Sequence, residues 1–138
     1  MTAGPAESVP LAWVHEIGST QVELVDRAST GAGEQALATT SQTGGRGRRG
    51  REWSCPAGSG LAMSVLLRPP RLDGWTWLPL VSGIAVVEAL GELDAPGLSL
   101  KWPNDVLCPP GKLAGLIADR VQDSASACPP AFVLGIGL

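Results

Sequence analysis

The hydrophobic positions of this chain follow two patterns: continuous or alternating apolar runs, typical of strands, and a spacing of three to four residues, typical of helices. The first part of the chain predicts a strand and then a helix. Residues 11–17 form an apolar run that predicts a short strand. A helical spacing of three to four residues follows and extends to Gly31, a typical C-terminal stop. Thr20 and Glu23 match a capping box, which predicts Thr20 as the N-cap residue of the helix.

A glycine-rich segment in the middle of the chain separates two further strands. Residues 35–40 lead into it and residues 61–67 follow it, and both runs are apolar enough for strands. From residue 75 to 93 the apolar positions again recur every three to four residues, which predicts a second helix. Pro79 falls in its first turn, where the missing N–H costs little.

The last third of the chain predicts three more strands. Residues 98–102 alternate between apolar and polar side chains, as in a half-buried strand, and residues 103–105 end it in a turn. Apolar runs over residues 112–119 and 132–138 predict two strands. The small, polar and proline-bearing residues 122–130 predict the loop between them.

Strands therefore dominate, helices number about two, and strand and helix do not alternate regularly. This favours an α+β fold with a mixed sheet and flanking helices over a doubly wound sheet. With 138 residues, of which 44% are hydrophobic, the chain is long enough for one domain with a real core. We expect residues 1–10 to be a disordered lead-in. We also expect the sequence to stop within a domain, because its last strand has no polar finish.

Neither a membrane span nor a secretory signal is predicted. No apolar run approaches the roughly 18 residues of a membrane span, and the first ten residues lack a basic region followed by an apolar one. Three cysteines (Cys55, Cys108 and Cys128) are odd in number and have no C-x-x-C spacing. They argue against a disulfide framework and against zinc, and they favour a cytoplasmic location.

The net charge of −3 conceals a local excess of positive charge. Residues 42–53 contain four of the ten basic residues, interleaved with glycines: Arg46, Arg48, Arg49 and Arg51. Glycine-rich turns let backbone N–H groups approach an anion, and arginine matches a carboxylate or a phosphate with two hydrogen bonds. This arginine loop, on an otherwise acidic chain, predicts the binding of a specific phosphate or carboxylate.

Other interpretations of the arginine loop have to be weighed. Gly45, Gly47 and Gly50 match the spacing of a dinucleotide-binding fingerprint, but the residues that follow cannot form the helix that this fingerprint needs. The chain has no P-loop motif. A disordered Arg-Gly tract that binds RNA would need many repeats and low hydrophobicity. A mobile, solvated basic loop stays open as an alternative.

Two further groups of polar residues are candidates for a site. Lys101 lies one residue before the end of the predicted strand 98–102, near a rim of loops where ligands are often bound. Spacing alone leaves a solvated lysine on an edge strand equally open. Ser19, Thr20 and Gln21 could bind a small polar ligand at the start of the first helix, although spacing alone favours helix capping.

Four motifs together resemble the catalytic domain of the biotin protein ligases. They are the segment Gln42–Trp53, Lys-Trp-Pro-Asn-Asp at 101–105, Lys-Leu-Ala-Gly at 112–115 and Gly-Ile-Gly-Leu at 135–138. Ser19 and Thr20 also fall where that family has a Ser-Thr-Asn motif. The resemblance extends from about residue 13 to the end. It implies an α+β fold similar to the catalytic domain of class II aminoacyl-tRNA synthetases.

The resemblance implies a two-step ligase reaction. The carboxylate of biotin attacks the α-phosphate of ATP, and the products are biotinyl-5′-adenylate and pyrophosphate. A lysine of a biotin carboxyl carrier protein then takes the biotin and releases AMP. Biotin, ATP and Mg²⁺ are the small molecules that this implies. Because the sequence leaves no room for the N-terminal helix-turn-helix of repressor-type members, we expect no DNA binding.

The resemblance also implies roles for individual residues. Lys101 resembles the lysine that contacts the biotin carboxyl group and the α-phosphate, and Lys101 and Arg48 are the expected catalytic residues. The residues expected to bind biotin are Ser19, Thr20, Gln21, Gln42, Arg46, Gly47, Arg48, Lys101 and Gly115. Those expected to bind the nucleotide are Arg48, Arg51, Trp53 and Asn104. Lys112 resembles part of a strand whose backbone meets the biotin ring.

The sequence departs from the family pattern at three points. Gln21 stands where asparagine is commoner, and Asp119 stands where glutamate is usual. The chain also ends before the asparagine that typically follows Gly-Ile-Gly-Leu and before a small C-terminal β domain, which predicts a partial catalytic domain over residues 1–138. The alternatives are a lipoate-type ligase with a less arginine-rich loop, a truncated inactive fragment, and an Arg-Gly module that binds nucleic acid.

Overall fold

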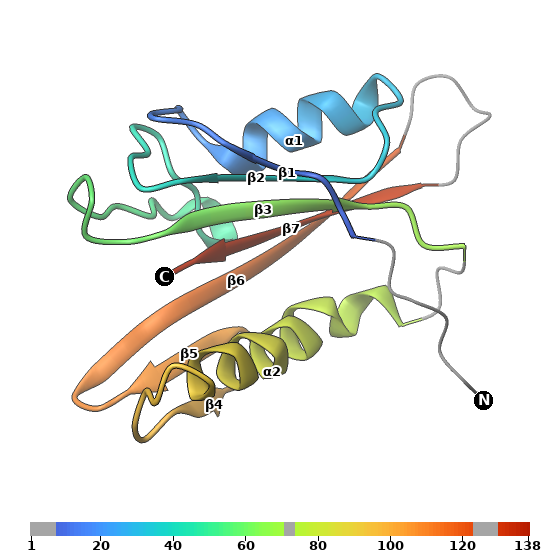
Figure 1. Cartoon of the computed structure of the whole chain (residues 1–138). Coiled ribbons are helices and arrows are strands. Elements are labelled where there is room, and N and C mark those ends of the chain that lie inside the picture. Colours follow the sequence, from blue (N-terminus) through green and yellow to red (C-terminus); the bar gives the residue numbers. More distant parts are fainter. Residues whose placement is uncertain (1–7, 71–73, 123–129) are drawn as a thin grey trace.

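A single mixed sheet with helices on both faces forms the described part of the molecule, which confirms the predicted α+β class. The computed structural model describes residues 8–70, 74–122 and 130–138. In chain order the elements are β1 (Leu11–Trp13), α1 (Thr20–Ser29), β2 (Gln35–Thr39), the 3-10 helix η1 (Arg48–Gly50), β3 (Ala62–Leu67), the 3-10 helix η2 (Trp75–Trp77), α2 (Leu78–Gly91), β4 (Ser99–Lys101), β5 (Asp105–Cys108), β6 (Gly111–Val121) and β7 (Ala131–Gly137). The strand order is β1-β2-β3-β7-β6-β5-β4 (Figure 1). Only β1 and β2 run parallel; the other neighbours are antiparallel.

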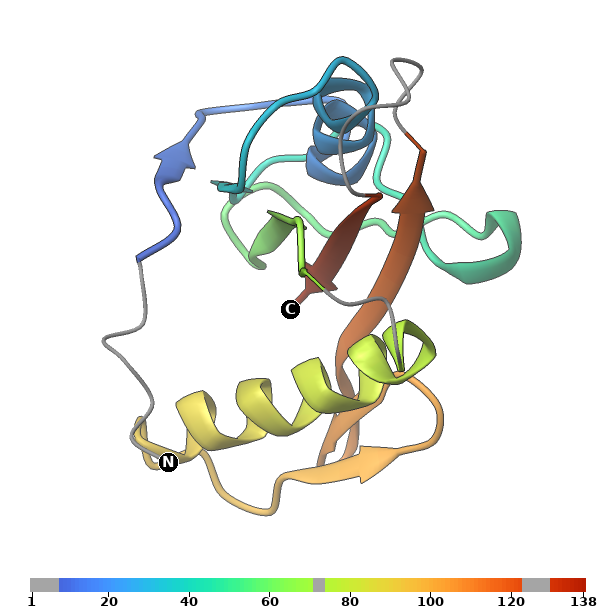
Figure 2. The same cartoon turned by 90° about the vertical axis from the view of Figure 1, so that its right-hand side faces the viewer.

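The two long helices bury opposite faces of this sheet. Leu24 of α1 packs in one cluster with Val133 of β7, and Val86 of α2 packs in a second cluster with Leu116 of β6. Val133 pairs with Asp119, three residues from Leu116 on β6, so the two clusters face opposite ways. In Figures 1 and 2, α1 lies beside β2 and β3, whereas α2 lies beside β4 and β5.

The start of α1 differs from the prediction. Ser19, not Thr20, is the N-cap residue, and its Oγ accepts a hydrogen bond from the N–H of Val22 at 3.4 Å. Glu23 forms an ion pair with Arg27 at 2.8 Å. The predicted capping box is therefore wrong, because a tertiary partner, described below, takes the hydroxyl of Thr20.

The other predicted elements are present with changed limits. β1 is shorter than predicted, and Ile17 makes only an isolated bridge to Gln42. The N–H of Ala36 donates to the carbonyl of Pro10 at 2.7 Å, so the expected lead-in already contacts the sheet at residue 10. Residues 1–7 and most of the predicted loop 122–130 lie outside the described residues. Pro79 falls in the first turn of α2, as predicted.

The predicted half-burial of the strand around Leu100 is wrong. All three residues of β4 are exposed, because β4 is the edge strand of the sheet. Leu100 is 39% exposed and Trp102 is 68% exposed. The ring of Trp102 meets that of Trp77 with 6.1 Å between centroids.

Two predicted absences can be compared with the described residues. No helix within residues 8–70, 74–122 and 130–138 has the length and hydrophobicity needed to span a membrane. Cys55 and Cys108 are free thiols, and Cys128 lies outside the described residues.

Candidate active site

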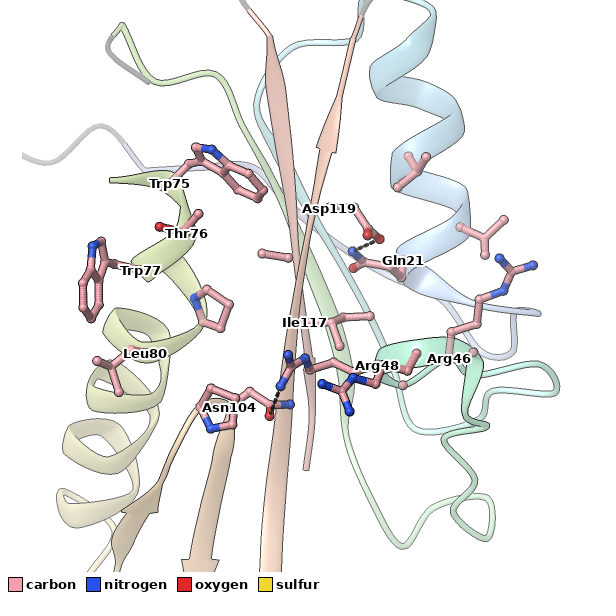
Figure 3. A pocket seen from close by; sticks show the side chains of 18 of the residues that line it. Gln21, Arg46, Arg48, Trp75, Thr76, Trp77, Leu80, Asn104, Ile117 and Asp119 are labelled. Atoms are coloured by element: carbon pink, nitrogen blue, oxygen red, sulfur yellow. Dashed lines mark hydrogen bonds between the residues drawn. The ribbon is translucent and has the colours of Figure 1, made fainter. Parts of the chain in front are cut away.

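Two neighbouring cavities lie where the arginine loop meets the sheet. The large cavity, of about 1010 Å³, extends from α1 past β6 to η2 and the start of α2 (Figure 3). The small cavity, of about 50 Å³, is enclosed by the arginine loop, the start of α1 and strands β3, β6 and β7. The two cavities share the residues Gln21, Arg46, Gly47, Arg48, Asn104 and Ile117.

Buried hydrogen bonds fix the polar floor of the small cavity. Thr20 is 2% exposed, and its Oγ1 lies 2.9 Å from Oγ of Ser64. Ser64 is 1% exposed and donates to Oε1 of Gln21 at 3.0 Å. The backbone N–H of Thr20 donates to Oε1 of Gln42 at 2.8 Å. The hydroxyl of Ser64 donates to Gln21, and Oγ1 of Thr20 lies within hydrogen-bond distance of both Ser64 and Oε1 of Gln42, the latter at 3.2 Å.

Gln21 has all its hydrogen-bonding groups paired within the protein. Its Nε2 donates to Oδ2 of Asp119 and to the carbonyl of Val133, both at 2.9 Å. Because a primary amide has two N–H donors, both are used. Gln21 therefore holds the floor in place and offers no free donor to a ligand.

A paired set of glycines makes room for Trp53 on the sheet. Gly115 of β6 pairs with Gly137 of β7. A Cβ at Gly137 would lie 2.5 Å from Nε1 of Trp53, and one at Gly115 would lie 3.0 Å from its Cζ3. The indole ring thus lies directly on the backbone of both strands. These two glycines are explained by this close approach.

Lys112 brings a positive charge to the small cavity from the start of strand β6. Its Nζ lies 2.8 Å from Oδ1 of Asp105 and 5.2 Å from the ring centroid of Trp53. The side chain of Lys112 is 43% exposed and that of Asp105 is 21% exposed. The carboxylate and the ring therefore hold an ammonium at the wall of the cavity and leave it in contact with solvent.

The arginine loop forms a small hairpin of its own. Arg46 bridges Glu52, and the N–H of Gly47 donates to the carbonyl of Arg51 at 2.8 Å. At the tip, Arg49 has φ 58° and ψ 37°, a left-handed conformation that is unfavourable for a residue with a Cβ. The loop thus has internal hydrogen bonds and a strained tip.

One side-chain contact ties this hairpin to the far side of the cavities. Nη1 of Arg48 donates to Oδ1 of Asn104 at 2.9 Å, as Figure 3 shows. Asn104 is in turn bound twice to Leu116 of β6: its carbonyl accepts from the Leu116 N–H, and its Nδ2 donates to the Leu116 carbonyl, each at 2.9 Å. Arg48 is therefore held, through Asn104, against strand β6.

Most of the predicted site residues meet at these cavities. The small cavity is lined by Ser19, Thr20, Gln21, Gln42, Arg46, Gly47, Arg48, Trp53, Asn104 and Gly115. Trp53, predicted on the nucleotide side, lines the small cavity and not the large one. Arg51 is exposed and lines neither of the two.

Lys101 lies outside the two cavities that the arginine loop borders, although it lines a narrow cleft with Asn104 and Leu116, and its catalytic role stays a prediction. Lys101 is exposed on the edge strand β4 and lines neither the large nor the small cavity. It lines an outer groove of about 500 Å³ that also includes Lys112. The two lysines lie on different strands of the β4-β5-β6 arrangement, and sequence spacing could not tell which strand faces the loop.

Three residues at the site carry side-chain roles that sequence reasoning missed. Ser64 links Thr20 to Gln21, Asp105 binds Lys112, and Asp119 binds Gln21. Ser64 gave one signal that could have found it, since it is a hydroxyl within an otherwise apolar strand. Asp119 had been marked only as a departure from the family pattern.

The comparisons with known proteins agree with this geometry. Residues 15–135 match the model of the biotin/lipoate A/B protein ligase family. A biotin--[acetyl-CoA-carboxylase] ligase from Mycobacterium tuberculosis is 40% identical over 132 residues, which cover 91% of this chain and 47% of that protein. The bifunctional ligase/repressor BirA of Escherichia coli is 36% identical over 126 residues, covering 88% of this chain and 38% of that protein.

A solved structure supports the same assignment. The biotin protein ligase from Aquifex aeolicus in complex with biotin and ATP has a TM-score of 0.76 to this chain and 39% sequence identity, covering 94% of this chain and 51% of that one. The chain thus spans about half the length of these relatives, or less. With the matched family model, the shared motifs and the shared fold, the chain belongs to the biotin/lipoate A/B protein ligase family.

Proposed function

We propose that this chain contains the adenylation site of a biotin protein ligase. The carboxylate oxygen of biotin attacks the α-phosphorus of ATP, and the bond to pyrophosphate breaks. The amine of a lysine on a biotin carboxyl carrier protein then attacks the carbonyl carbon of the adenylate, and AMP leaves. The observation that carries this proposal is the convergence of Arg48 and Lys112 on one small cavity with a fixed polar floor.

Electrostatics explains why the reaction needs these cations. A carboxylate and a phosphate that approach to about 4 Å repel each other by about 4 kcal/mol at an effective dielectric constant near 20. Lys112 of β6 and Arg48 of the arginine loop both line the small cavity. Two cations at one cavity offset this repulsion and align the reacting groups. We therefore assign to Lys112 a contact with the reacting anions, and the same role for Lys101 stays a prediction to be tested beside it.

The polar floor suits the ureido ring of biotin. The ring has two N–H donors and one carbonyl acceptor, and Ser19, Thr20 and Gln42 line the cavity with groups that can accept or donate. Gln21 supports the residues that contact the ring and does not donate to it, because both of its N–H groups already have partners. We assign direct ring contacts to Ser19, Thr20 and Gln42, and we assign to Gln21 the support of that surface.

The large cavity is the proposed nucleotide side. Its volume of about 1010 Å³ exceeds the roughly 300 Å³ at the lower end of ligand sites. Arg46 and Arg48 line it together with the indole rings of Trp75, Trp77 and Trp102. Arg48 lies where the two cavities meet, which fits a contact with the phosphate that both substrates share.

The described residues do not build a magnesium site. Within residues 8–70, 74–122 and 130–138, no group of three or more histidine, cysteine or acidic side chains could hold a metal ion. Two carboxylates line the large cavity: Asp119, which accepts a hydrogen bond from Gln21, and the exposed Asp26. Magnesium in such sites is usually held by substrate phosphates and one or two carboxylates, so we propose that it arrives bound to the phosphate oxygens of ATP.

Two other functions remain as outcomes of the test. A lipoate-type ligase would use the same two steps on lipoic acid, but its loop is expected to be less arginine-rich. A nucleic-acid-binding module would use the arginine loop as a general cation. The loop here is hydrogen-bonded to Asn104 through Arg48, and a loop held in place favours recognition of a defined ligand. A cytoplasmic location, suggested by the cysteine pattern, stays a prediction.

The test follows formation of an adenylate. The purified chain is incubated with ATP labelled at the α-phosphate and with biotin or lipoate, and the products are separated by thin-layer chromatography. We expect biotinyl-adenylate from the parent chain and at least about 100-fold less from Lys112→Ala. Lipoyl-adenylate alone would select the alternative ligase. Absence of both products, with oligonucleotide binding that weakens steeply with salt, would select the nucleic-acid module.

A further inference from the structure

We propose that Asn104 is the positioning residue that holds Arg48 at the junction of the two cavities. The carboxamide faces Arg48 with its oxygen and Leu116 with its nitrogen. A guanidinium offers only donors and a backbone carbonyl only accepts, so the two partners fix this orientation of the amide. The expected effect on adenylate formation rests on the proposed function, whereas the contact between Arg48 and Asn104 is observed independently of it.

The anchor is rigid because Asn104 takes the place of a paired strand residue. Strand β5 pairs with β6 only as far as Gly115. At the next position, the backbone carbonyl and the side-chain Nδ2 of Asn104 bind the N–H and the carbonyl of Leu116. Asn104 is thus tied to the sheet by two hydrogen bonds before it contacts the loop.

The arginine loop, in contrast, has little to hold its tip. The hydrogen bonds of Gly47 and Arg51 are internal to the hairpin, and Arg49 has a left-handed backbone conformation that is unfavourable for a residue with a Cβ. Among the described residues, the contact from Arg48 to Asn104 is the side-chain hydrogen bond that joins this tip to the sheet. It spans 56 residues of sequence. Loss of this contact would free the tip to relax.

The small cavity is narrow, so the contact between Arg48 and Asn104 affects how a ligand can enter it. At about 50 Å³ it is several-fold smaller than the roughly 300 Å³ of a typical ligand site. A larger ligand therefore needs either the adjoining space of the large cavity, with which the small one shares lining residues, or the displacement of a wall. Strands β3, β6 and β7 are held by ladder hydrogen bonds, so the movable wall is the one made by Arg46, Gly47 and Arg48. Asn104 thereby sets both the position of Arg48 and the ease with which that wall opens.

Two variants of Asn104 separate this role from a purely structural one. Asn104→Ala removes the acceptor for Arg48 and the donor to Leu116. Asn104→Asp keeps an acceptor for Arg48, now negatively charged, and replaces the donor to Leu116 with an oxygen that cannot donate. If Asn104 positions Arg48, loop cleavage and adenylate release keep the rates of the parent in the aspartate variant, and both rates rise in the alanine variant. If Asn104 only completes the pairing between β5 and β6, both rates rise in both variants.

The first measurement is limited trypsin digestion, which needs no substrate. Mass spectrometry follows cleavage between residues 46 and 52, where the loop carries four arginines. Because cleavage reports the open population, we expect about five- to tenfold faster loop cleavage in Asn104→Ala and a rate within about twofold of the parent in Asn104→Asp. In an Arg48→Ala background, Asn104→Ala should add less than about twofold. Unfolding curves of all variants verify that they are folded.

The second measurement follows release of biotinyl-adenylate by filter binding. We expect Asn104→Ala to release biotinyl-adenylate about five- to tenfold faster than the parent, as in the digestion. Asn104→Asp should release it at a rate close to that of the parent. Equal cleavage of parent and Asn104→Ala would overturn the inference, and so would equal acceleration in both Asn104 variants. If no variant and no parent forms the adenylate, the proposed function fails while the digestion still decides the role of Asn104.

Discussion

Gln21 and Asp119 lie in direct contact although 98 residues separate them: Nε2 of Gln21 donates to Oδ2 of Asp119 at 2.9 Å (Figure 3). The family resemblance marks both positions as departures, because asparagine and glutamate are usual there. An amide that is longer by one methylene here meets a carboxylate that is shorter by one. The contact indicates that the two departures compensate each other.

This compensation can be tested by restoring the side chains that are usual in the family, asparagine at position 21 and glutamate at position 119. Gln21→Asn or Asp119→Glu alone should separate or crowd the pair and destabilise the fold by about 1–2 kcal/mol, because a buried amide loses a partner. The double variant should recover to within about 0.5 kcal/mol of the parent. Urea unfolding of the four proteins measures the coupling. Additive losses in the double variant would show that the two positions are independent.

The two lysines of the β4-β5-β6 region should differ sharply in adenylate formation. Lys112 lines the small cavity, so Lys112→Ala should lower the rate of biotinyl-adenylate formation by at least about 100-fold, as removal of a group that stabilises developing charge does. Lys101 lines neither substrate cavity, so Lys101→Ala should change this rate by less than about threefold. Single-turnover assays with both variants compare them directly. A larger loss in Lys101→Ala would restore the assignment implied by sequence resemblance.

The contact between Trp53 and the sheet predicts a steric effect at Gly137. Gly137→Ala should displace the indole ring and destabilise the fold by about 1–3 kcal/mol, because the added Cβ would meet it at 2.5 Å. Gly111→Ala is the matched control on β6, since a Cβ there would meet nothing within 4 Å. Denaturation monitored by far-UV circular dichroism gives the stabilities. Equal stability of the two variants would contradict the close packing of Trp53.

The buried hydroxyl of Ser64, in the floor of the small cavity, predicts an effect on biotin affinity. Ser64→Ala leaves Oε1 of Gln21 without its donor, which should cost about 1–3 kcal/mol of stability and weaken biotin binding. Ser59→Ala alters an exposed serine and serves as the control. Calorimetric titration with biotin measures the affinities. Unchanged affinity in Ser64→Ala would show that the floor does not depend on this hydrogen bond.

Some features of the fold follow from the sequence because they depend on local geometry. The spacing of apolar residues in 75–93 and 112–119 predicted a helix and a strand that the structure contains as α2 and β6, with changed ends. The motifs of the arginine loop also indicated an anion site and the family. The capping box at Thr20 failed because Ser64, 44 residues away, binds that hydroxyl.

The sequence by itself predicted both long helices, every strand except β5 and the cationic character of the arginine loop, since each depends on residue types a few positions apart. The tertiary structure alone decided which lysine meets the loop, which carboxylate meets Gln21 and why Gly115 and Gly137 carry no side chain. These relationships depend on strand order and register. Both are fixed by long-range packing of α1 and α2 on opposite faces of the sheet, which spacing along the chain does not encode.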